Sequence, residues 1–274
     1  MKIFEEIIMS KLTVFFQILT KSVFKPKLVK DLVEERKQSN EDEKHKNHHY
    51  KYDFHSIEEF LKIIFPNYDF KKYEHEINDL EIEVKKFFTE LETQKYPSKK
   101  KPYPTSYSIN SDSRRLLYYL CRILKPKIIV ETGVAYGISS AYILKALQKN
   151  DFGTLYSIDS VFRPWQTEKM IGSVIPKNLR DRWNLVIGKS ADELQNLFNG
   201  VGKTDIFIHD SSHTYRNMMF EFNIALEKMN ENGIIISDDI LGNDAFYDFT
   251  NKNNLKNHII EVDENVGLGI INKI

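Results

Sequence analysis

Apolar runs and amphipathic stretches alternate along the second half of the chain. The clearest run, Ile128 to Val130, is followed by an acid and two spaced glycines, as in a fully buried parallel strand that ends in a tight turn. A helix is expected directly after the turn, with Ser139 and Ser140 capping its first turn. Further strands are predicted at 154–158, 185–187, 205–209 and 233–237, with helices between them.

Regular alternation of strands and helices is typical of a parallel sheet with right-handed crossovers. The last two predicted strands, 259–262 and 267–271, favour an antiparallel hairpin that closes the sheet. We therefore expect an α/β domain over residues 111–274. In such a sheet, ligands bind beyond the carboxyl ends of the strands, so the residues found there indicate the function.

Residues 1–97 have a helical pattern without a catalytic-looking cluster. Ser56 and Glu59 form a capping box ahead of an apolar stripe, and a second helix is predicted over 73–91. A basic, proline-containing linker at 98–110 separates this helical N-terminal region from the α/β domain. These two helices are expected to cover the sheet, to build a dimer contact or to shape a substrate pocket.

A polar stretch at 37–52 is expected to be solvated or disordered, because its centre contains almost no apolar residue. It includes His45, His48 and His49. We interpret these histidines as solvated rather than metal-binding, since a flexible polar tract offers no fixed geometry and no partners that would orient the rings.

The first 24 residues predict an amphipathic helix. The longest uncharged run, 12–20, is too short to span a bilayer, and acids near the start argue against a signal peptide. We expect no transmembrane segment. Burial against the body of the protein or against a second subunit is favoured, which suggests a homo-oligomer such as a dimer. Peripheral membrane contact through 1–24 is the weaker alternative.

Charge and cysteine content narrow the classes of function. Lys+Arg and Asp+Glu both number 39, so no global field draws the chain to nucleic acid. Cys121 is the only cysteine, which excludes an internal disulfide and a thiolate zinc site and fits a reducing cytoplasm. A cytoplasmic protein that does not act on nucleic acid is therefore expected.

The turn after the first strand of the α/β domain reads Glu131-Thr-Gly133-Val-Ala-Tyr-Gly137. A dinucleotide site requires three glycines as G-x-G-x-x-G, so that backbone N–H groups can approach a pyrophosphate. Here a carboxylate stands where the first glycine would be, and it would repel an anion but attract an amino-bearing ligand. This turn resembles the first motif of the class I S-adenosylmethionine-dependent methyltransferases.

Acids also follow three later strands. Asp159 ends the second strand and can accept hydrogen bonds from ribose hydroxyls, with capping of the next helix as the alternative. Asp210, Asp238 and Asp239 end the fourth and fifth strands, and His213 lies three residues beyond Asp210. Converging carboxylates repel one another unless a cation lies between them, and Mg²⁺ prefers oxygen ligands. Without a metal, these acids would cap helices and bond the substrate.

Together these motifs resemble the metal-dependent O-methyltransferases over residues 106–272. The likeness is to the macrocin and other antibiotic-sugar O-methyltransferases and to cephamycin-pathway proteins, and more distantly to the catechol type. It implies a Rossmann-like sheet of seven strands, S-adenosyl-L-methionine as donor and Mg²⁺ as an aid. On this resemblance the cofactor-binding residues are Glu131, Gly133, Gly137 and Ser139 for methionine, Asp159 for ribose, and Ser190 and Ala191 for adenine.

The resemblance also implies the chemistry. Asp210, Asp238 and Asp239 match the metal ligands, although the catechol enzymes have an amide where Asp239 stands. His213 occupies the position of their general-base lysine, so either His213 or Asp210 would take the proton of the acceptor hydroxyl. We expect Mg-assisted methylation of a hydroxyl on a small molecule. Two alternatives stay open: an NAD-linked oxidoreductase on a similar sheet, and a non-catalytic protein that binds an adenosyl ligand or serves only as a scaffold.

Two aromatic segments, 103–107 and 162–165, lie where a pocket wall is expected. Their aromatic and arginine content would suit a sugar or a phenolic ring as acceptor. Ordinary loop packing is the alternative.

Overall fold

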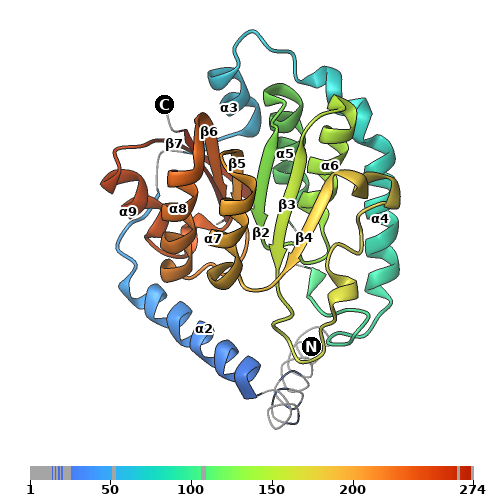
Figure 1. The fold of residues 1–274 in the computed structure, drawn as a ribbon, viewed down its shortest axis with the longest axis vertical. Coiled ribbons are helices and arrows are strands. Elements are labelled where there is room, and N and C mark those ends of the chain that lie inside the picture. Colours follow the sequence, from blue (N-terminus) through green and yellow to red (C-terminus); the bar gives the residue numbers. More distant parts are fainter. Residues whose placement is uncertain are drawn as a thin grey trace.

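The structure is a computed structural model of the chain, and it describes residues 26–50, 54–105, 109–263 and 266–272 together with positions 14, 16, 18 and 20. Within these residues one mixed sheet of eight strands forms the centre of the molecule, with helices on both faces (Figure 1). In chain order the strands are β1 (Phe54–His55), β2 (Ile128–Thr132), β3 (Thr154–Asp159), β4 (Trp183–Ile187), β5 (Thr204–His209), β6 (Met229–Ser237), β7 (Lys256–Asp263) and β8 (Val266–Asn272).

The strand order across the sheet is β1-β7-β8-β6-β5-β2-β3-β4. Strand β8 is antiparallel to both β6 and β7, while the pairs among β2 to β6 are parallel. The expected α/β sheet with an antiparallel C-terminal hairpin is therefore confirmed. The seven expected strands are β2 to β8, and the short β1 is an addition that pairs in parallel with β7. Two residues are too few to give a periodic signal in the sequence.

The helices pack in two layers. The main ones are α2 (Pro26–His45), α3 (Ile57–Ile64), α4 (Asn78–Glu92), α5 (Ser111–Leu124), α6 (Ile138–Asn150), α7 (Ser190–Val201), α8 (Tyr215–Lys228) and α9 (Ala245–Lys252). Side chains of α3 to α6 share one hydrophobic core, and side chains of α7 to α9 share the other. Ile129 lies in the first core and Val130 in the second, as expected for a strand that is buried on both faces.

The helical N-terminal region covers one face of the sheet. Phe60 and Leu61 of α3 and Leu80 and Val84 of α4 belong to the same core as Leu116 of α5. Of the three roles that the sequence left open for the two helices, α3 and α4 show the first, since they cover the sheet. The capping box between Ser56 and Glu59 is present, whereas the helix expected over 73–91 begins as a 3-10 turn at Lys71–Ile77 before α4.

The polar stretch expected to be solvated or disordered is helical in its first part, because α2 extends to His45. This helix is held by polar contacts and not by an apolar stripe. Asp42 accepts a hydrogen bond from the backbone N–H of Tyr215 at 2.7 Å, and Asp244 accepts from the N–H of Asn47 at 2.7 Å. The sequence pattern did not reveal the helix, since none of its residues is buried.

The described residues contain no helix with both the length and the apolar character needed to cross a bilayer. The amphipathic helix expected over 1–24 falls almost entirely outside the described residues. The proposed division of the chain at 98–110 remains a prediction.

Candidate functional site

One large cavity lies at the carboxyl ends of the central strands. It has a volume of about 1710 Å³ and is lined by the glycine turn after β2, the loops after β3 and β5, the end of β6, and the first residues of α5 and α7. Pockets for a single small molecule are usually roughly 300–1,000 Å³. This cavity therefore has room for two ligands side by side. Strands β2 and β5, where the strand order reverses, are neighbours at its centre.

The glycine turn brings backbone close to the cavity. Gly133 and Gly137 have φ values of 84° and 89°, as the sequence predicted, and such values favour glycine. A side chain at Gly133 would begin 1.8 Å from the carbonyl oxygen of Asp210, and one at Gly137 would begin 2.7 Å from the Cα of Gly172. Glycine is therefore required at both positions, because a side chain would clash with the neighbouring backbone and because φ is positive.

Glu131 is fully buried and is absent from the described residues that line the cavity. Its carboxylate accepts hydrogen bonds from the hydroxyls of Ser139 and Ser140, both at 2.6 Å, and from Ser157 at 2.9 Å. Burial raises the pKa of Glu131, which these hydroxyls partly offset. The expected capping of α6 by Ser139 and Ser140 is wrong, because both hydroxyls satisfy this buried acid instead. Ser139 does line the cavity.

Asp159 lines the cavity at the end of β3 and organises the glycine turn. One carboxylate oxygen accepts from the backbone N–H groups of Val134 and Ala135, at 3.1 and 2.7 Å. The other accepts from the N–H of Ser160 at 2.6 Å. Burial raises the pKa of Asp159 to about 6. The side chain therefore holds the turn in shape at the edge of the cavity.

Two further walls flank Asp159. Ser190 and Ala191, at the start of α7, line the cavity, and their expected contact with adenine remains a prediction. Phe162 and the buried Tyr103 line the cavity as well. Trp165 does not, because it is buried and donates its indole N–H to the carbonyl of Pro102 at 2.9 Å. The two aromatic segments thus form part of the wall, and residues 106–108 lie outside the described ranges.

The first turn of α5 adds a contact that the sequence did not reveal. Asn110 caps this helix by accepting from the N–H of Ser113 at 2.8 Å. Both residues line the cavity. The Ser113 hydroxyl is buried and has no hydrogen-bond partner among the described residues. A helix N-terminus with a spare hydroxyl is suited to an anionic group such as a carboxylate.

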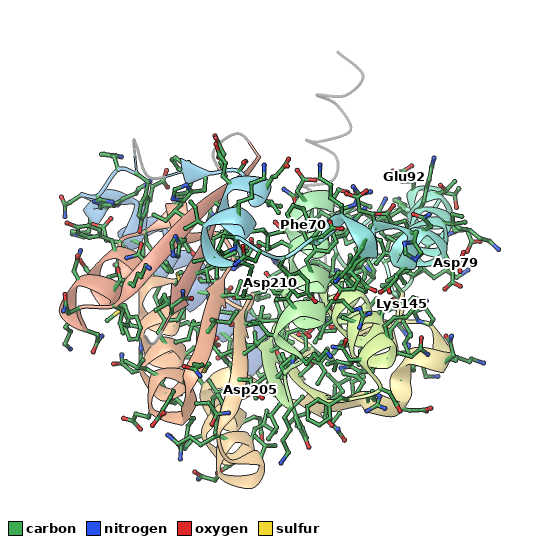
Figure 2. All side chains as sticks on the ribbon, turned by 90° about the horizontal axis from the view of Figure 1, so that it is seen from above. Phe70, Asp79, Glu92, Lys145, Asp205 and Asp210 are labelled. Carbon is green, nitrogen blue, oxygen red and sulfur yellow. The ribbon has the colours of Figure 1, made fainter. Side chains whose placement is uncertain are left out.

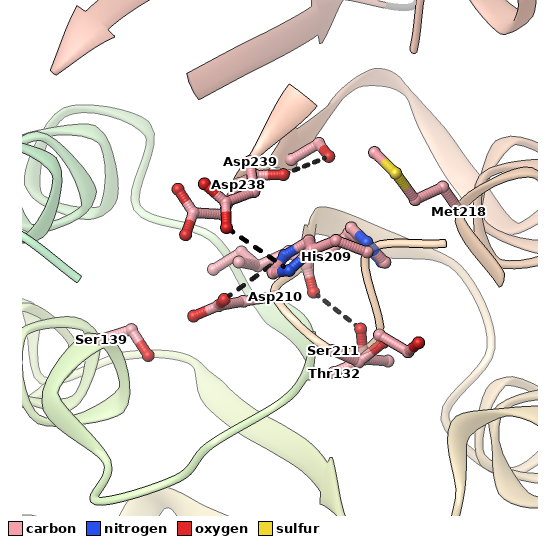
Figure 3. A network of polar contacts seen from close by, with 12 residues as sticks. Thr132, Ser139, His209, Asp210, Ser211, Met218, Asp238 and Asp239 are labelled. Atoms are coloured by element: carbon pink, nitrogen blue, oxygen red, sulfur yellow. Dashed lines mark hydrogen bonds and ion pairs between the residues drawn. The ribbon is translucent and has the colours of Figure 1, made fainter. Parts of the chain in front are cut away.

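An acid group lies beside the glycine turn. Asp210, His213 and Asp238 each offer a ligand atom, and these atoms lie within 4.8 Å of one another. Asp239 contacts the same histidine, with 3.6 Å between its carboxylate and the Nδ1 of His213. Figure 3 shows the carboxylates of Asp210, Asp238 and Asp239 converging, and Figure 2 shows Asp210 in the middle of the molecule. The expected convergence is present, but the tightest group contains His213 in place of Asp239.

The charges in this group are strongly perturbed. Burial and the neighbouring Asp238 raise the pKa of Asp210 well above its usual value, and burial together with Asp239 raises the pKa of Asp238 to about 7. Burial and the nearby His209 lower the pKa of His213 to about 4. His213 is therefore neutral at pH 7, with a nitrogen lone pair available.

A divalent cation fits this group. A cation would relieve the repulsion between the carboxylates, and the group offers two carboxylates and one neutral imidazole. Mg²⁺ prefers oxygen ligands, whereas Mn²⁺ and other transition ions also accept imidazole nitrogen. The presence of His213 therefore widens the expected choice of metal beyond Mg²⁺.

Helix α2 forms a further wall of the cavity, beside the acid group, which the sequence also did not reveal. Figure 1 shows it at the carboxyl-end side of the sheet. Asp31 forms an ion pair with Lys189 at 2.5 Å, and Glu35 accepts from the hydroxyl of Ser212 at 3.1 Å. Asp31, Glu35 and Gln38 line the cavity. Because Ser212 lies between Asp210 and His213, α2 is connected directly to the loop that carries the acid group.

Comparisons with known proteins agree with this fold. Residues 130–240 match the model of a family described as a methyltransferase domain. A search of the curated proteins gives no match. Among solved structures, the O-methyltransferase from Bacillus cereus in complex with S-adenosylhomocysteine is 16% identical, with a TM-score of 0.55 over 79% of this chain and 97% of that chain.

Two other solved structures share the fold. TomG from Streptomyces achromogenes, an O-methyltransferase involved in tomaymycin synthesis and solved with S-adenosylmethionine, is 14% identical with a TM-score of 0.55, covering 78% of this chain and 93% of that chain. The Podospora anserina methyltransferase PaMTH1, bound to S-adenosylhomocysteine, is 15% identical with a TM-score of 0.52, covering 69% and 86%. At these identities the likeness shows the fold.

Proposed function

We propose that this chain, which carries a class I S-adenosylmethionine-dependent methyltransferase domain, is an O-methyltransferase that acts on a small-molecule hydroxyl with the help of a divalent cation. One observation carries the proposal. A single cavity joins the glycine turn and Asp159 to the acid group of Asp210, His213 and Asp238. Methyl transfer requires this proximity, since donor and acceptor must be aligned for in-line displacement.

The donor would occupy the half of the cavity around the glycine turn. Asp159 would accept from the ribose hydroxyls, and Ser190 and Ala191 would border the adenine. The methionine end would lie near Ser139, which is held by Glu131. The N-terminus of α5, with the spare hydroxyl of Ser113, would receive the methionine carboxylate.

The acceptor hydroxyl would lie at the acid group. Asp210 and Asp238 would hold the cation, together with His213 or Asp239. When bound, a divalent cation lowers the pKa of a coordinated hydroxyl and fixes its direction. The residues of the chain would exclude water and orient the acceptor oxygen toward the donor.

His213 is the favoured general base when it is not a metal ligand. Its lowered pKa leaves it neutral at pH 7, and its Nε2 lies 3.7 Å from the carboxylate of Asp210. Asp210 would take this role if no cation binds.

The acceptor is a sugar or a phenol in this proposal, because Phe162 offers an aromatic surface and the inward face of α2 offers hydrogen-bonding groups.

We further propose that the protein works in the cytoplasm as a homo-oligomer. The single cysteine, Cys121, is buried, and burial raises the pKa of its thiol, which fits a reducing compartment without a disulfide. Sedimentation of the full chain would measure the oligomeric state.

Transfer of a labelled methyl group from S-adenosylmethionine to a panel of sugars and phenols tests the function. Activity is expected with Mg²⁺ or Mn²⁺ and is expected to disappear in Asp210→Asn and Asp238→Asn. Glu227→Gln, on the exposed face of α8, is the matched control and should retain activity. Full turnover in excess chelator would remove the cation from the account, and failure to bind any adenosyl ligand would favour the scaffold alternative.

A further inference from the structure

Glu221 is a buried carboxylate outside the acid group. It lies on the inward face of α8 with Met218, Phe222 and Ala225, and all four are fully buried. Burial alone would raise the pKa of Glu221, but the adjacent His209 and the hydroxyl donors lower it to about 2. The side chain is therefore ionised inside the protein. Burial of a carboxylate costs free energy unless hydrogen-bond donors satisfy its lone pairs. The donors around Glu221 therefore indicate its role.

Four side chains donate to the Glu221 carboxylate. The Thr132 hydroxyl and the His209 Nδ1 each lie 2.6 Å from Oε2. The Ser211 hydroxyl lies 2.7 Å from Oε1, and the Asn217 amide lies 3.1 Å from it. Three of these donors come from the ends of two neighbouring strands or from the loop that follows. One carboxylate therefore ties together β2, β5 and the loop after β5.

Asp210 lies between two of these donors in the sequence. His209 precedes it and Ser211 follows it. Its own backbone N–H donates to the carbonyl of Thr132 at 2.9 Å, and Thr132 is a third partner of Glu221. The backbone of Asp210 is thus fixed on both sides and from the neighbouring strand.

Glu221 also supports His213 through His209. The two imidazole rings lie edge to face with their centroids 5.3 Å apart. The bond from Nδ1 to Glu221 fixes the orientation of the His209 ring, against which the His213 ring packs. Two of the three members of the acid group, Asp210 and His213, are therefore linked to Glu221 through its direct hydrogen-bond partners.

The same carboxylate reaches the donor half of the cavity. Thr132 directly precedes Gly133, the first glycine of the turn, and it pairs with His209 in the register of β2 and β5. We infer that Glu221 is a positioning residue that fixes Asp210 and His213 relative to the glycine turn, so that acceptor and donor meet in line. This inference rests on the proposed function, and Glu221 itself is absent from the described residues that line the cavity.

A double-mutant cycle in the full chain tests the inference. Glu221→Gln keeps the shape but leaves one oxygen for four donors, and Ser211→Ala removes one donor. We expect Glu221→Gln to lower kcat about 10- to 100-fold, with little change in the Kd for S-adenosylhomocysteine or in the acceptor KM. Ser211→Ala should lower kcat by up to about tenfold. The double variant should be no slower than Glu221→Gln, because both changes break the same network.

The affinity for Mn²⁺, measured by electron paramagnetic resonance, gives a readout besides activity. Glu221→Gln should weaken this affinity about 10- to 100-fold, as expected when a partner that orients the ligands is lost. Glu227→Gln, exposed on the same helix, is the matched control and should change neither quantity. Should Glu221→Gln fail to fold, Ser211→Ala and Thr132→Val each remove one bond and carry the test alone.

The inference would be overturned if the effects of Glu221→Gln and Ser211→Ala on kcat multiplied in the double variant. It would also be overturned if the variants folded and their kcat and Mn²⁺ affinity were unchanged. Failure of the proposed function is distinguishable, because it shows in the unmodified protein as a lack of methyl transfer. In that case crystals of Glu221→Gln decide the matter, since the inference requires a displaced Asp210 carboxylate and an unmoved one contradicts it.

Discussion

A side chain at Gly133 would begin 1.8 Å from the carbonyl oxygen of Asp210. The glycine turn and the loop that carries the acid group are therefore in direct backbone contact. They meet where β2 lies beside β5, with Thr132 and His209 paired in register. This contact joins the part of the cavity at the glycine turn to the part at the acid group.

Gly133→Ala should abolish binding of S-adenosylhomocysteine and lower the melting temperature. The φ of 84° alone costs a residue with a side chain roughly 1–2 kcal/mol, and the added carbon also displaces the Asp210 backbone. Gly200→Ala in α7 is the matched control, because no atom lies within 4 Å of the added carbon. It should stabilise the protein by about 0.5–1 kcal/mol. Unchanged ligand affinity in Gly133→Ala would contradict the contact.

Asp159→Asn should weaken binding of S-adenosylhomocysteine by about tenfold or more, the equivalent of roughly 1.4 kcal/mol. An amide offers one acceptor oxygen where the carboxylate now serves the N–H groups of Val134, Ala135 and Ser160. Calorimetric titration measures the affinity. Equal affinities of Asp159→Asn and the unmodified protein would remove Asp159 from the donor site.

Ligand affinity should also depend on pH through Asp159. Burial raises its pKa to about 6, and only the ionised form accepts hydrogen bonds at both oxygens. Above that pH the carboxylate is ionised and the Kd should be constant. As the pH falls below about 6, the proton must be released on binding, so the Kd should rise by about tenfold per pH unit. Titrations at several pH values check this, and a pH-independent Kd in the unmodified protein would contradict it.

Glu35→Gln should raise the KM for the acceptor without changing the Kd for S-adenosylhomocysteine. Glu35 accepts from Ser212 and lines the acceptor side of the cavity, so its loss releases α2 from the acid loop. One charge-assisted hydrogen bond is worth about 1.5–3 kcal/mol, which sets an upper limit of roughly 10- to 100-fold on KM. Glu43→Gln, exposed on the same helix, is the control. Equal KM values for Glu35→Gln and Glu43→Gln would show that this contact of α2 plays no part in acceptor binding.

The sequence predicted the sheet and the acids at its edge because both leave local signals. Ile129 and Val130 belong to a run of β-branched residues that only a doubly buried strand explains, and their side chains enter opposite cores. Once strands are parallel, their carboxyl ends share an edge, so Asp210 and Asp238 had to converge. Asp159 followed from the same reasoning.

Other features depend on contacts between distant segments and left weaker signals. No residue of helix α2 is buried, so the helix left no core-facing pattern in the sequence. The role of Glu131 was expected to be contact with a ligand, but three serines enclose its carboxylate. Glu221 carried one usable signal, a charged residue on the apolar face of a helix between Met218 and Phe222.

Crystals grown with S-adenosylhomocysteine and Mn²⁺ test the central claim most directly, because the anomalous scattering of manganese locates the cation. The account predicts the ligand in the large cavity, with its ribose at Asp159, and a manganese peak bonded to Asp210 and Asp238. Ligand bound away from Asp159, or no manganese at these two aspartates beside a bound ligand, would contradict it.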